Sequence, residues 1–336
     1  MTMRFRLFPL MLLALSTTAA AADLPPPAVQ AATFAQPQQL IDIGGRRLHL
    51  HCSGDGPVTV IFDAPSGDAG WSWFAVQPQV AQQTRACVYD RAGLGFSDPS
   101  GRSGTSEHAV DDLHRLLAAA RIAPPYVLVG NSYGGANVQL YAYRYPAEVQ
   151  GLVLVEAMHE DEKTRLEAVT QGKLKQASEM QAAMEKQCVA QSLQGFVPGS
   201  EMLLNCTGGV QQRYGRSLAA VVLASELTPS YWQAASSENG HFDDSNAQLR
   251  AARKPLGALP LVVLTRGVSP YAVPGKPQSA LNKALEDENA TIQGEMAALS
   301  TQGVQRIVPG AGHIIQADQP AAVVLAVGDV LKALAR

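Results

Sequence analysis

The residues best suited to chemistry form the segment GNSYGG at residues 130–135. It follows a short apolar run and precedes a helical pattern, and a serine between glycines at such a junction is typical of a nucleophile elbow. Gly130 and Gly134 must be small so that the strand and the helix can approach closely. The N-terminus of the helix stabilises negative charge in front of the serine. We therefore expect Ser132 to be a nucleophile, flanked by Asn131 in the turn.

A histidine that could activate this serine lies near the end of the chain. His313 closes the segment PGAGH at residues 309–313, between the last expected strand and a closing helix at residues 320–334. Functional groups gather at the carboxyl ends of parallel strands. A general base must reach the proton of its nucleophile. We expect His313 to serve Ser132 as general base and acid.

The elements that position these residues follow an alternating order. Two alternating runs at residues 40–43 and 47–52 flank a Gly-Gly turn, which predicts a β-hairpin. Short apolar runs then recur with helical patterns between them. They occupy residues 58–62, 85–89, 126–129, 151–155, 261–264 and 304–308. Strands that are buried on both faces of a sheet have such continuous apolar runs. The sequence predicts an α/β fold with a mostly parallel, eight-stranded sheet flanked by helices.

One stretch is too long for a single crossover helix. About a hundred residues separate two of the expected strands, whereas a crossover needs only a short connection and one helix. We predict a helical cap, or lid, over residues 158–257. The core is then residues 39–157 and 258–336.

The N-terminal residues predict export. Two arginines, an apolar run and small residues ending in Ala20-Ala21-Ala22 have the order of a signal peptide over residues 1–22. The apolar run is too short to span a membrane, so we expect no stable membrane anchor after cleavage. Residues 23–38, rich in Pro, Ala and Gln, predict a disordered lead-in. The expected location is the periplasm or the medium.

An oxidising compartment allows the four cysteines to pair. Four cysteines have three pairings, and buried free thiols are the alternative. We favour Cys52 with Cys87, on adjacent core strands, and Cys188 with Cys206, within the insertion. The spacing of the cysteines does not fit a zinc site, and we expect no metal.

With the elbow, the GAGH loop, the strand order and the segment YDRAGLGFSD at residues 89–98, the chain resembles the α/β-hydrolase superfamily over about residues 40–335. Secreted bacterial members carry cysteines where Cys52 and Cys87 stand, which supports pairing them. The resemblance implies Ser132 as nucleophile, His313 as base, an acid between them in sequence, and no cofactor.

The acid is where the sequence departs from that pattern. Members commonly place an aspartate after the strand that is here residues 261–264, but no carboxylate follows before Glu286. Some members use the end of the strand after the elbow helix, where Glu156 stands. A carboxylate ending a buried strand needs a partner, and we choose Glu156. The lesser candidates are Glu160, Asp161, Asp287 and Asp243.

The resemblance also implies an oxyanion hole made of two backbone N–H groups. One comes from Tyr133, the residue after the nucleophile, and the other from the loop after the first parallel strand. Pro65 has no N–H, so Ser66 takes the donor role there. Asp90 and Arg91 are expected to be scaffold, in a buried salt bridge or turn.

These observations predict an exported serine hydrolase that cleaves ester-type bonds of a small-molecule substrate through an acyl-enzyme. One alternative is another hydrolase that uses the same triad: an amide or lactone hydrolase, or an aminopeptidase with an amine anchor among Glu226, Asp243 and Asp244. A non-catalytic binding protein with this fold is the other alternative. The net charge of −3 and 6% aromatic residues argue against nucleic acid as a partner. The oligomeric state is not indicated.

Overall fold

The fold is organised around one sheet. A computed structural model describes residues 27–208, 210–273 and 275–335. Within them lies an eight-stranded sheet with the order β1-β2-β4-β3-β5-β6-β7-β8. The strands are β1 (Gln39–Asp42), β2 (Arg47–Ser53), β3 (Thr59–Asp63), β4 (Arg85–Tyr89), β5 (Tyr126–Ser132), β6 (Val149–Ala157), β7 (Leu261–Arg266) and β8 (Gly303–Val308). β2 is antiparallel to β1 and β4, and the remaining pairs are parallel. The predicted fold class is confirmed.

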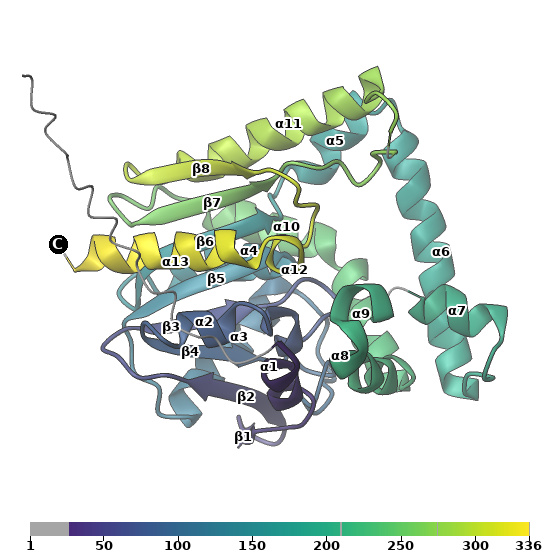
Figure 1. Cartoon of the computed structure of the whole chain (residues 1–336), viewed down its shortest axis with the longest axis horizontal. Helices are drawn as coiled ribbons and strands as arrows, with labels where there is room; N and C mark the ends of the chain where they lie inside the picture. Colours follow the sequence, from purple (N-terminus) through teal and green to yellow (C-terminus); the bar gives the residue numbers. More distant parts are fainter. Residues whose placement is uncertain (1–26, 209, 274, 336) are drawn as a thin grey trace, which may run out of the picture.

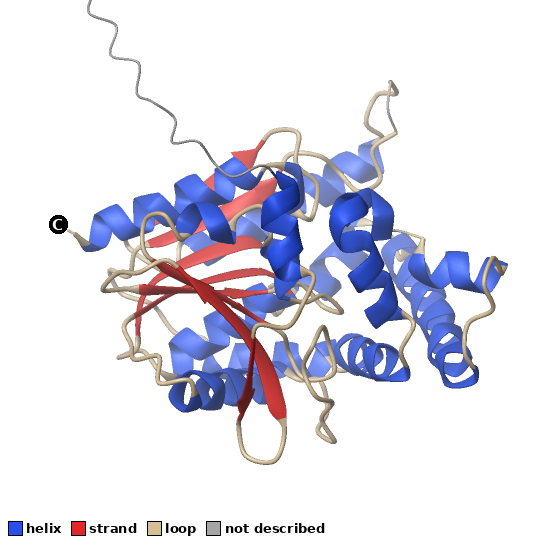
Figure 2. Ribbon diagram, turned by 60° about the horizontal axis from the view of Figure 1, so that its bottom comes forward, coloured by secondary structure: helices blue, strands red, loops and turns tan. Residues whose placement is uncertain are grey.

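Helices cover both faces of this sheet (Figure 2). The core helices are α1 (Pro27–Phe34), α2 (Gln77–Val80), α3 (Ser106–Ala119), α4 (Tyr133–Arg144), α11 (Ala280–Ala297), α12 (Ile315–Asp318) and α13 (Pro320–Leu334), with a 3-10 turn at Gly70–Trp73. Successive strand residues face opposite sides. Leu128 therefore packs in one apolar cluster with α3, α4 and α11, while Val127 and Val129 pack in the other with α2 and α13.

The segment between β6 and β7 forms helices α5 to α10, drawn in teal and green in Figure 1. They are α5 (Glu162–Val169), α6 (Lys173–Gln194), α7 (Glu201–Thr207), α8 (Val210–Glu226), α9 (Pro229–Gly240) and α10 (Phe242–Ala252). We call them the cap helices. α10 packs on α3 and α4, and α5 packs on α11, so both ends of the insertion rest on the core. α6 and α7 lie farthest from the sheet (Figure 1).

The chain begins its fold earlier than its composition predicted. α1 occupies Pro27–Phe34, and the side chains of Ala31 and Phe34 are buried in the core. The prediction of a disordered lead-in is therefore wrong from residue 27 onward. The reason is tertiary packing, since α1 lies against α8 and the 3-10 turn. The rest of that lead-in and the predicted signal peptide lie outside the described residues.

Two disulfides join parts of the fold. One links Cys52 and Cys87, which are paired directly across β2 and β4. The other links Cys188 in α6 with Cys206 in α7. This is the pairing favoured from the sequence. In the part of the chain that the structure describes, no helix is both long and apolar enough to cross a membrane.

Candidate active site

Ser132 lies at a strained junction between β5 and α4. It is the last residue of the strand and the N-cap of the helix, with φ 53° and ψ −119°. A non-glycine residue with such backbone angles costs about 1–3 kcal/mol, and residues of this kind cluster at functional sites. The residue that follows β6 supports the strained turn, because the Met158 N–H donates to the Ser132 carbonyl at 2.9 Å. Ser132 therefore has the backbone geometry of a nucleophile elbow.

The flanking glycines are required by close backbone contacts. A Cβ on Gly130 would lie 2.3 Å from the carbonyl oxygen of Gly134. A Cβ on Gly134 would lie 2.4 Å from the carbonyl oxygen of Asp63. Both distances are far below a van der Waals contact, so a side chain at either position would displace backbone. The elbow is thereby pressed against the end of β3, where the loop expected to complete the oxyanion hole begins.

Asn131 connects the elbow with the histidine loop. Its Nδ2 donates to the carbonyl oxygens of Val155, at 2.7 Å, and of His313, at 3.1 Å. Its Oδ1 accepts from Gln316 Nε2 at 3.1 Å. Asn131 is fully buried, so these bonds satisfy polar groups that would be costly to leave unpaired. They fix the backbone of the two candidate catalytic residues to one another.

The histidine loop is also held from its other side. The Asp318 carboxylate accepts from the Gly312 N–H at 2.8 Å, directly before His313. His313 itself is half-buried between β8 and α12. Ser132 and His313 line the same cavity. The structure thus brings together the two residues that the sequence paired.

That cavity has a volume of about 730 Å³ and lies between the core and the cap helices. Apolar walls come from Met158, Leu166, Leu174 and Phe242. Its charged lining consists of five acidic and two basic side chains, which are Glu162, Glu167, Glu179, Glu185, Asp243, Lys163 and Lys175. The volume and the apolar part of the wall suit a small molecule.

Glu156 is the penultimate residue of β6 and has a positive φ of 44°, as Ser132 does, although it is not a glycine. It is 2% exposed, and Arg266 and Asn289 contact its carboxylate. Arg266 donates from its backbone N–H to Oε2 and from Nη1 to Oε1, both at 2.7 Å, and Asn289 Nδ2 donates to Oε1 at 3.0 Å. Burial raises the pKa of Glu156, and the Arg266 guanidinium opposes that rise. Its role as the acid of a triad stays a prediction.

The other acid candidates are paired with basic side chains. The ion pairs are Glu160 with Arg253 at 2.6 Å, Asp161 with Arg250 at 2.5 Å, Asp287 with Lys283 at 2.6 Å and Asp243 with Lys163 at 2.9 Å. Of these four acids only Asp243 lines the cavity that contains Ser132 and His313. Of the three residues named as amine anchors, Glu226 and Asp244 are not part of its lining.

The side chains of His159, Glu160 and Asp161 offer ligand atoms within 4.8 Å of one another. These atoms already have partners. His159 Nδ1 accepts from the Asp161 N–H at 3.0 Å, and arginines bind both carboxylates. The group is therefore explained as a hydrogen-bonded junction between the two ends of the insertion.

The two N–H groups expected in the oxyanion hole belong to the elbow and to the loop after β3. Tyr133 is the first residue of α4, so its N–H is one of the helix-terminal donors without an acceptor inside the helix. Ser66 belongs to the loop after β3, and its N–H makes no hydrogen bond within the described part of the chain. Both N–H groups are therefore available to donate hydrogen bonds, as an oxyanion hole requires.

Arg91 holds the loop that contains Ser66. It is 5% exposed and donates to Asp63 Oδ1 at 2.6 Å, to the Ala64 carbonyl at 2.7 Å and to the Pro65 carbonyl at 2.8 Å. Its Nε donates to Glu238 Oε1 of α9 at 2.6 Å. The expected scaffold role of Arg91, in a buried salt bridge, agrees with these contacts.

Sequence reasoning missed three acidic or basic residues of this region. Arg266 and Glu238 are buried ion-pair partners, and no local pattern reveals a partner more than a hundred residues away. Glu162 lines the cavity at the start of α5. Burial and then the charge of Glu156 raise the pKa of Glu162 to about 7. The one sequence feature of Glu162 is its place in the first turn of a helix, and this does not indicate a functional role because glutamates are common there.

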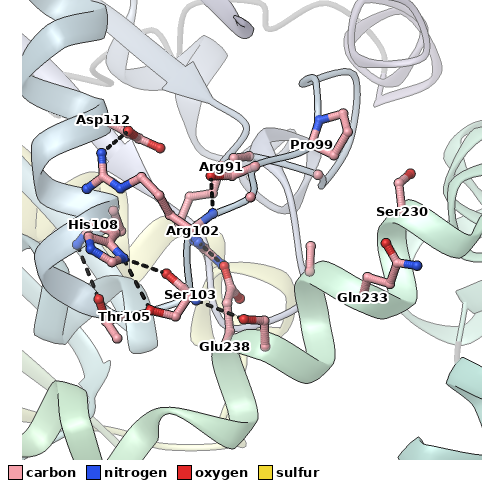
Figure 3. A pocket seen from close by; sticks show the side chains of 18 of the residues that line it. Arg91, Pro99, Arg102, Ser103, Thr105, His108, Asp112, Ser230, Gln233 and Glu238 are labelled. Atoms are coloured by element: carbon pink, nitrogen blue, oxygen red, sulfur yellow. Dashed lines mark hydrogen bonds and ion pairs between the residues drawn. The ribbon is translucent and has the colours of Figure 1, made fainter.

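A second, smaller cavity of about 270 Å³ lies between α3, α9 and the loop that precedes α3 (Figure 3). It does not include Ser132 or His313. Its polar side chains contact one another, as with His108 Nδ1 and the Ser103 hydroxyl at 3.3 Å, and Arg102 and Asp112 at 3.5 Å. The Arg91–Glu238 pair forms part of its wall.

Comparisons with known proteins agree with this architecture. The alpha/beta hydrolase fold family matches residues 65–181. The structure resembles that of a thermophilic esterase from Thermogutta terrifontis, with a TM-score of 0.56 and 19% identity over 88% of this chain and 98% of that one. It also resembles DBJA, with a TM-score of 0.65 and 15% identity over 89% and 99% of the two chains. The chain has the α/β-hydrolase fold.

Sequence similarity to curated proteins is partial. A 2-hydroxy-6-oxo-2,4-heptadienoate hydrolase from Pseudomonas putida is 33% identical over 123 residues, which are 36% of this chain and 44% of that protein. The chain spans less than half the length of the curated relatives it matches.

Proposed function

We propose that the protein is a serine hydrolase that cleaves ester-type bonds of small molecules through an acyl-enzyme. The observation that carries this proposal is the strained Ser132 at the start of α4, in one cavity with His313. A serine in a strained turn has its hydroxyl exposed above the sheet, where a base can reach it. The Thermogutta terrifontis esterase and the Pseudomonas putida hydrolase support hydrolysis as the reaction class.

In this proposal His313 takes the proton of the Ser132 hydroxyl as its oxygen attacks the substrate carbonyl. The tetrahedral oxyanion accepts hydrogen bonds from the N–H groups of Tyr133 and Ser66. His313 then protonates the leaving alcohol, and an acyl-serine remains. Water, deprotonated by His313, attacks the acyl-serine and releases the acid and the free serine.

Glu156 is proposed as the third member of this triad. A carboxylate stabilises the imidazolium that forms when the histidine takes a proton. Three donors fix Glu156 at the carboxyl end of β6, the strand next to the one that carries Ser132. Its positive φ places a second strained residue beside the first, which supports a functional role.

The proposed place of action is outside the cytoplasm. Two disulfides, one in the sheet and one in the cap, suit an oxidising compartment. Disulfides of this kind are rare in reducing compartments, where thiols are kept reduced.

The test is burst kinetics with 4-nitrophenyl butyrate, together with labelling by a fluorophosphonate. The wild-type protein should release nitrophenol and should be labelled at Ser132, and Ser132→Ala should do neither. Ser178→Ala is the matched control, because Ser178 lines the same cavity and its hydroxyl only bonds the Leu174 carbonyl. A folded wild-type protein that neither turns over nor is labelled would show that the proposal is wrong.

A further inference from the structure

A carboxylate of the cap reaches into the loop that carries the expected second oxyanion donor. Glu238 of α9 is 5% exposed. Its Oε2 accepts from the Gly67 N–H at 2.8 Å and lies 3.2 Å from the Ser66 hydroxyl. Glu238 is 171 residues from Gly67 along the chain. We call residues 64–67 the oxyanion loop.

Arg91 binds the same loop and the same carboxylate. It donates to the Ala64 and Pro65 carbonyls, and it reaches Glu238 through Nε at 2.6 Å and Nη2 at 2.9 Å. The loop therefore lies between one arginine that binds its carbonyls and one glutamate that binds its N–H. Charge-assisted hydrogen bonds of this kind are stronger than neutral ones, so the pair defines the position of the loop.

The contact between α9 and the core leaves no room for the helix to shift. A Cβ on Gly93 would lie 2.8 Å from the Ala234 side chain, and a Cβ on Gly104 would lie 2.6 Å from the Glu238 backbone nitrogen. The Gly104 N–H also donates to Ser237 Oγ at 2.8 Å. The helix thus rests against loop backbone on both sides of Glu238, and Figure 3 shows Arg91 and Glu238 directed toward each other there.

The next residue of α9 extends this connection to the catalytic cavity. Asn239 Oδ1 accepts from the Ser66 hydroxyl at 2.6 Å, and its Nδ2 donates to Glu185 of α6 at 3.1 Å. Asn239 and Glu185 both line the cavity that contains Ser132. The oxyanion loop is therefore bonded to α9 directly and to α6 through Asn239, and both helices contribute to the wall of this cavity.

From these contacts we propose that Glu238 is a positioning residue for the oxyanion loop, so that the cap completes the catalytic centre. The inference rests on the proposed function, since it assigns Ser66 N–H to the oxyanion. Glu238 occupies the Gly67 N–H, while the Ser66 N–H has no hydrogen-bond partner within the described part of the chain. The carboxylate itself does not touch the substrate.

The chemistry of the contacts indicates which substitution is informative. All the groups that meet the Glu238 carboxylate are donors: the Gly67 N–H, the Ser66 hydroxyl and two arginine nitrogens. Glu238→Gln keeps the shape but replaces one acceptor with an N–H₂ donor, so one side of the network loses its bonds. Asp112→Asn is the matched control, because Asp112 is also a buried carboxylate bound by arginines and has no contact with the loop.

Two measurements test the proposal. Hydrogen exchange of a peptide covering residues 63–69 should be about tenfold faster in Glu238→Gln and unchanged in Asp112→Asn. With 4-nitrophenyl butyrate, kcat should fall about 10- to 100-fold in Glu238→Gln while KM stays within about threefold, since misplacing one oxyanion donor affects mainly the transition state. Asp112→Asn should keep kcat within about twofold.

Ser66→Ala covers the case in which Glu238→Gln does not fold. It removes the hydroxyl contacts to Glu238 and Asn239, keeps the backbone N–H and leaves Arg91 paired. It should raise exchange in the loop and lower kcat by about threefold or more. Unchanged exchange or unchanged kcat in the folded variants would overturn the inference. A wild-type protein without turnover or labelling overturns the proposed function instead. Failure of the proposed function therefore shows in the wild-type protein, whereas failure of the inference about Glu238 shows only in the variants.

Discussion

The guanidinium of Arg266 and the carboxylate of Glu156 form a buried ion pair, with 2.7 Å between Nη1 and Oε1. Arg266 also reaches Glu286 through Nε at 2.9 Å. The residue proposed as the catalytic acid is therefore also one partner in a buried charge network. Removing a single member of such a network leaves an uncompensated charge in the interior, which destabilises a protein by about 3–5 kcal/mol. Stability and activity must be separated when Glu156 is tested.

The double substitution Glu156→Gln with Arg266→Met makes that separation. Arg266→Met alone should lower the free energy of unfolding by about 3–5 kcal/mol, because the Glu156 carboxylate loses its partner. Glu156→Gln should lower kcat by about 10³- to 10⁴-fold, the effect of removing the acid from a triad. In the double variant most of the stability should return while kcat stays low. Urea unfolding and ester turnover measure the two quantities.

Wild-type turnover in a folded Glu156→Gln variant would contradict the assignment of the acid. Recovery of both stability and kcat in the double variant would show that Glu156 acts only through its ion pair.

Gly134→Ala should disturb the elbow and the oxyanion loop together. The new Cβ would lie 2.4 Å from the Asp63 carbonyl and 2.5 Å from the Ala64 carbonyl, so the backbone after β3 must move. Overpacking of this kind costs about 1–3 kcal/mol, and kcat should fall at least about tenfold because Ser66 moves with the loop. Gly101→Ala is the control, since a Cβ there meets nothing within 4 Å. Equal kcat in the two variants would mean that the loop tolerates the shift.

The fold could be predicted from the sequence because its signals are local. The apolar strand at residues 126–129, the small residues around Ser132 and the glycine-rich loop before His313 each act within a few residues. The close approach of Gly130 to the Gly134 carbonyl is also a contact between residues near in sequence, and it explains why a glycine is needed there. Pairing Cys52 with Cys87 followed from placing them on neighbouring strands.

What could not be predicted depends on contacts distant in sequence. Nothing near Glu156 or Glu238 indicates that Arg266 and Arg91 bind them, because those partners are brought close only by the sheet and the cap. α1 was missed for the same reason. Its composition suggested no structure, and the burial of Phe34 depends on packing against distant elements.

Glu162 should make stability decrease with rising pH. Burial and the neighbouring Glu156 charge raise its pKa from the ordinary value of 4.5 to about 7. Between these values the folded protein holds a proton that the unfolded chain releases, so the free energy of unfolding falls as pH rises through this window. Glu162→Gln stays neutral and should gain about 1–2 kcal/mol over wild type on going from pH 5 to pH 8.

Urea unfolding of both proteins at the two pH values measures this difference. Glu179→Gln controls for the loss of charge, because it removes an exposed carboxylate from the same cavity. A Glu162→Gln variant whose stability changes with pH in the same way as wild type would contradict the prediction.

Loss of the Cys188–Cys206 disulfide should loosen α6 and α7 and leave the sheet intact. Over the part of α6 that the structure describes, only Cys188 and Ser192 are buried, so apolar packing holds this helix weakly. The disulfide closes a segment with a sequence separation of 18, for which chain entropy gives about 3 kcal/mol. In Cys188→Ala/Cys206→Ala, hydrogen exchange should rise across residues 173–207 and stay slow in β5 and β6.

The matched variant is Cys52→Ala/Cys87→Ala. Its disulfide joins directly paired residues of β2 and β4, where the ladder and the core also hold the strands. Loss of that bond should lower the midpoint of global unfolding without selective exchange in α6 and α7. If removing Cys188–Cys206 speeds exchange equally in the sheet, the two cap helices do not open as a separate unit. Because α6 carries Glu185 in the cavity wall, selective opening should also raise KM for the ester.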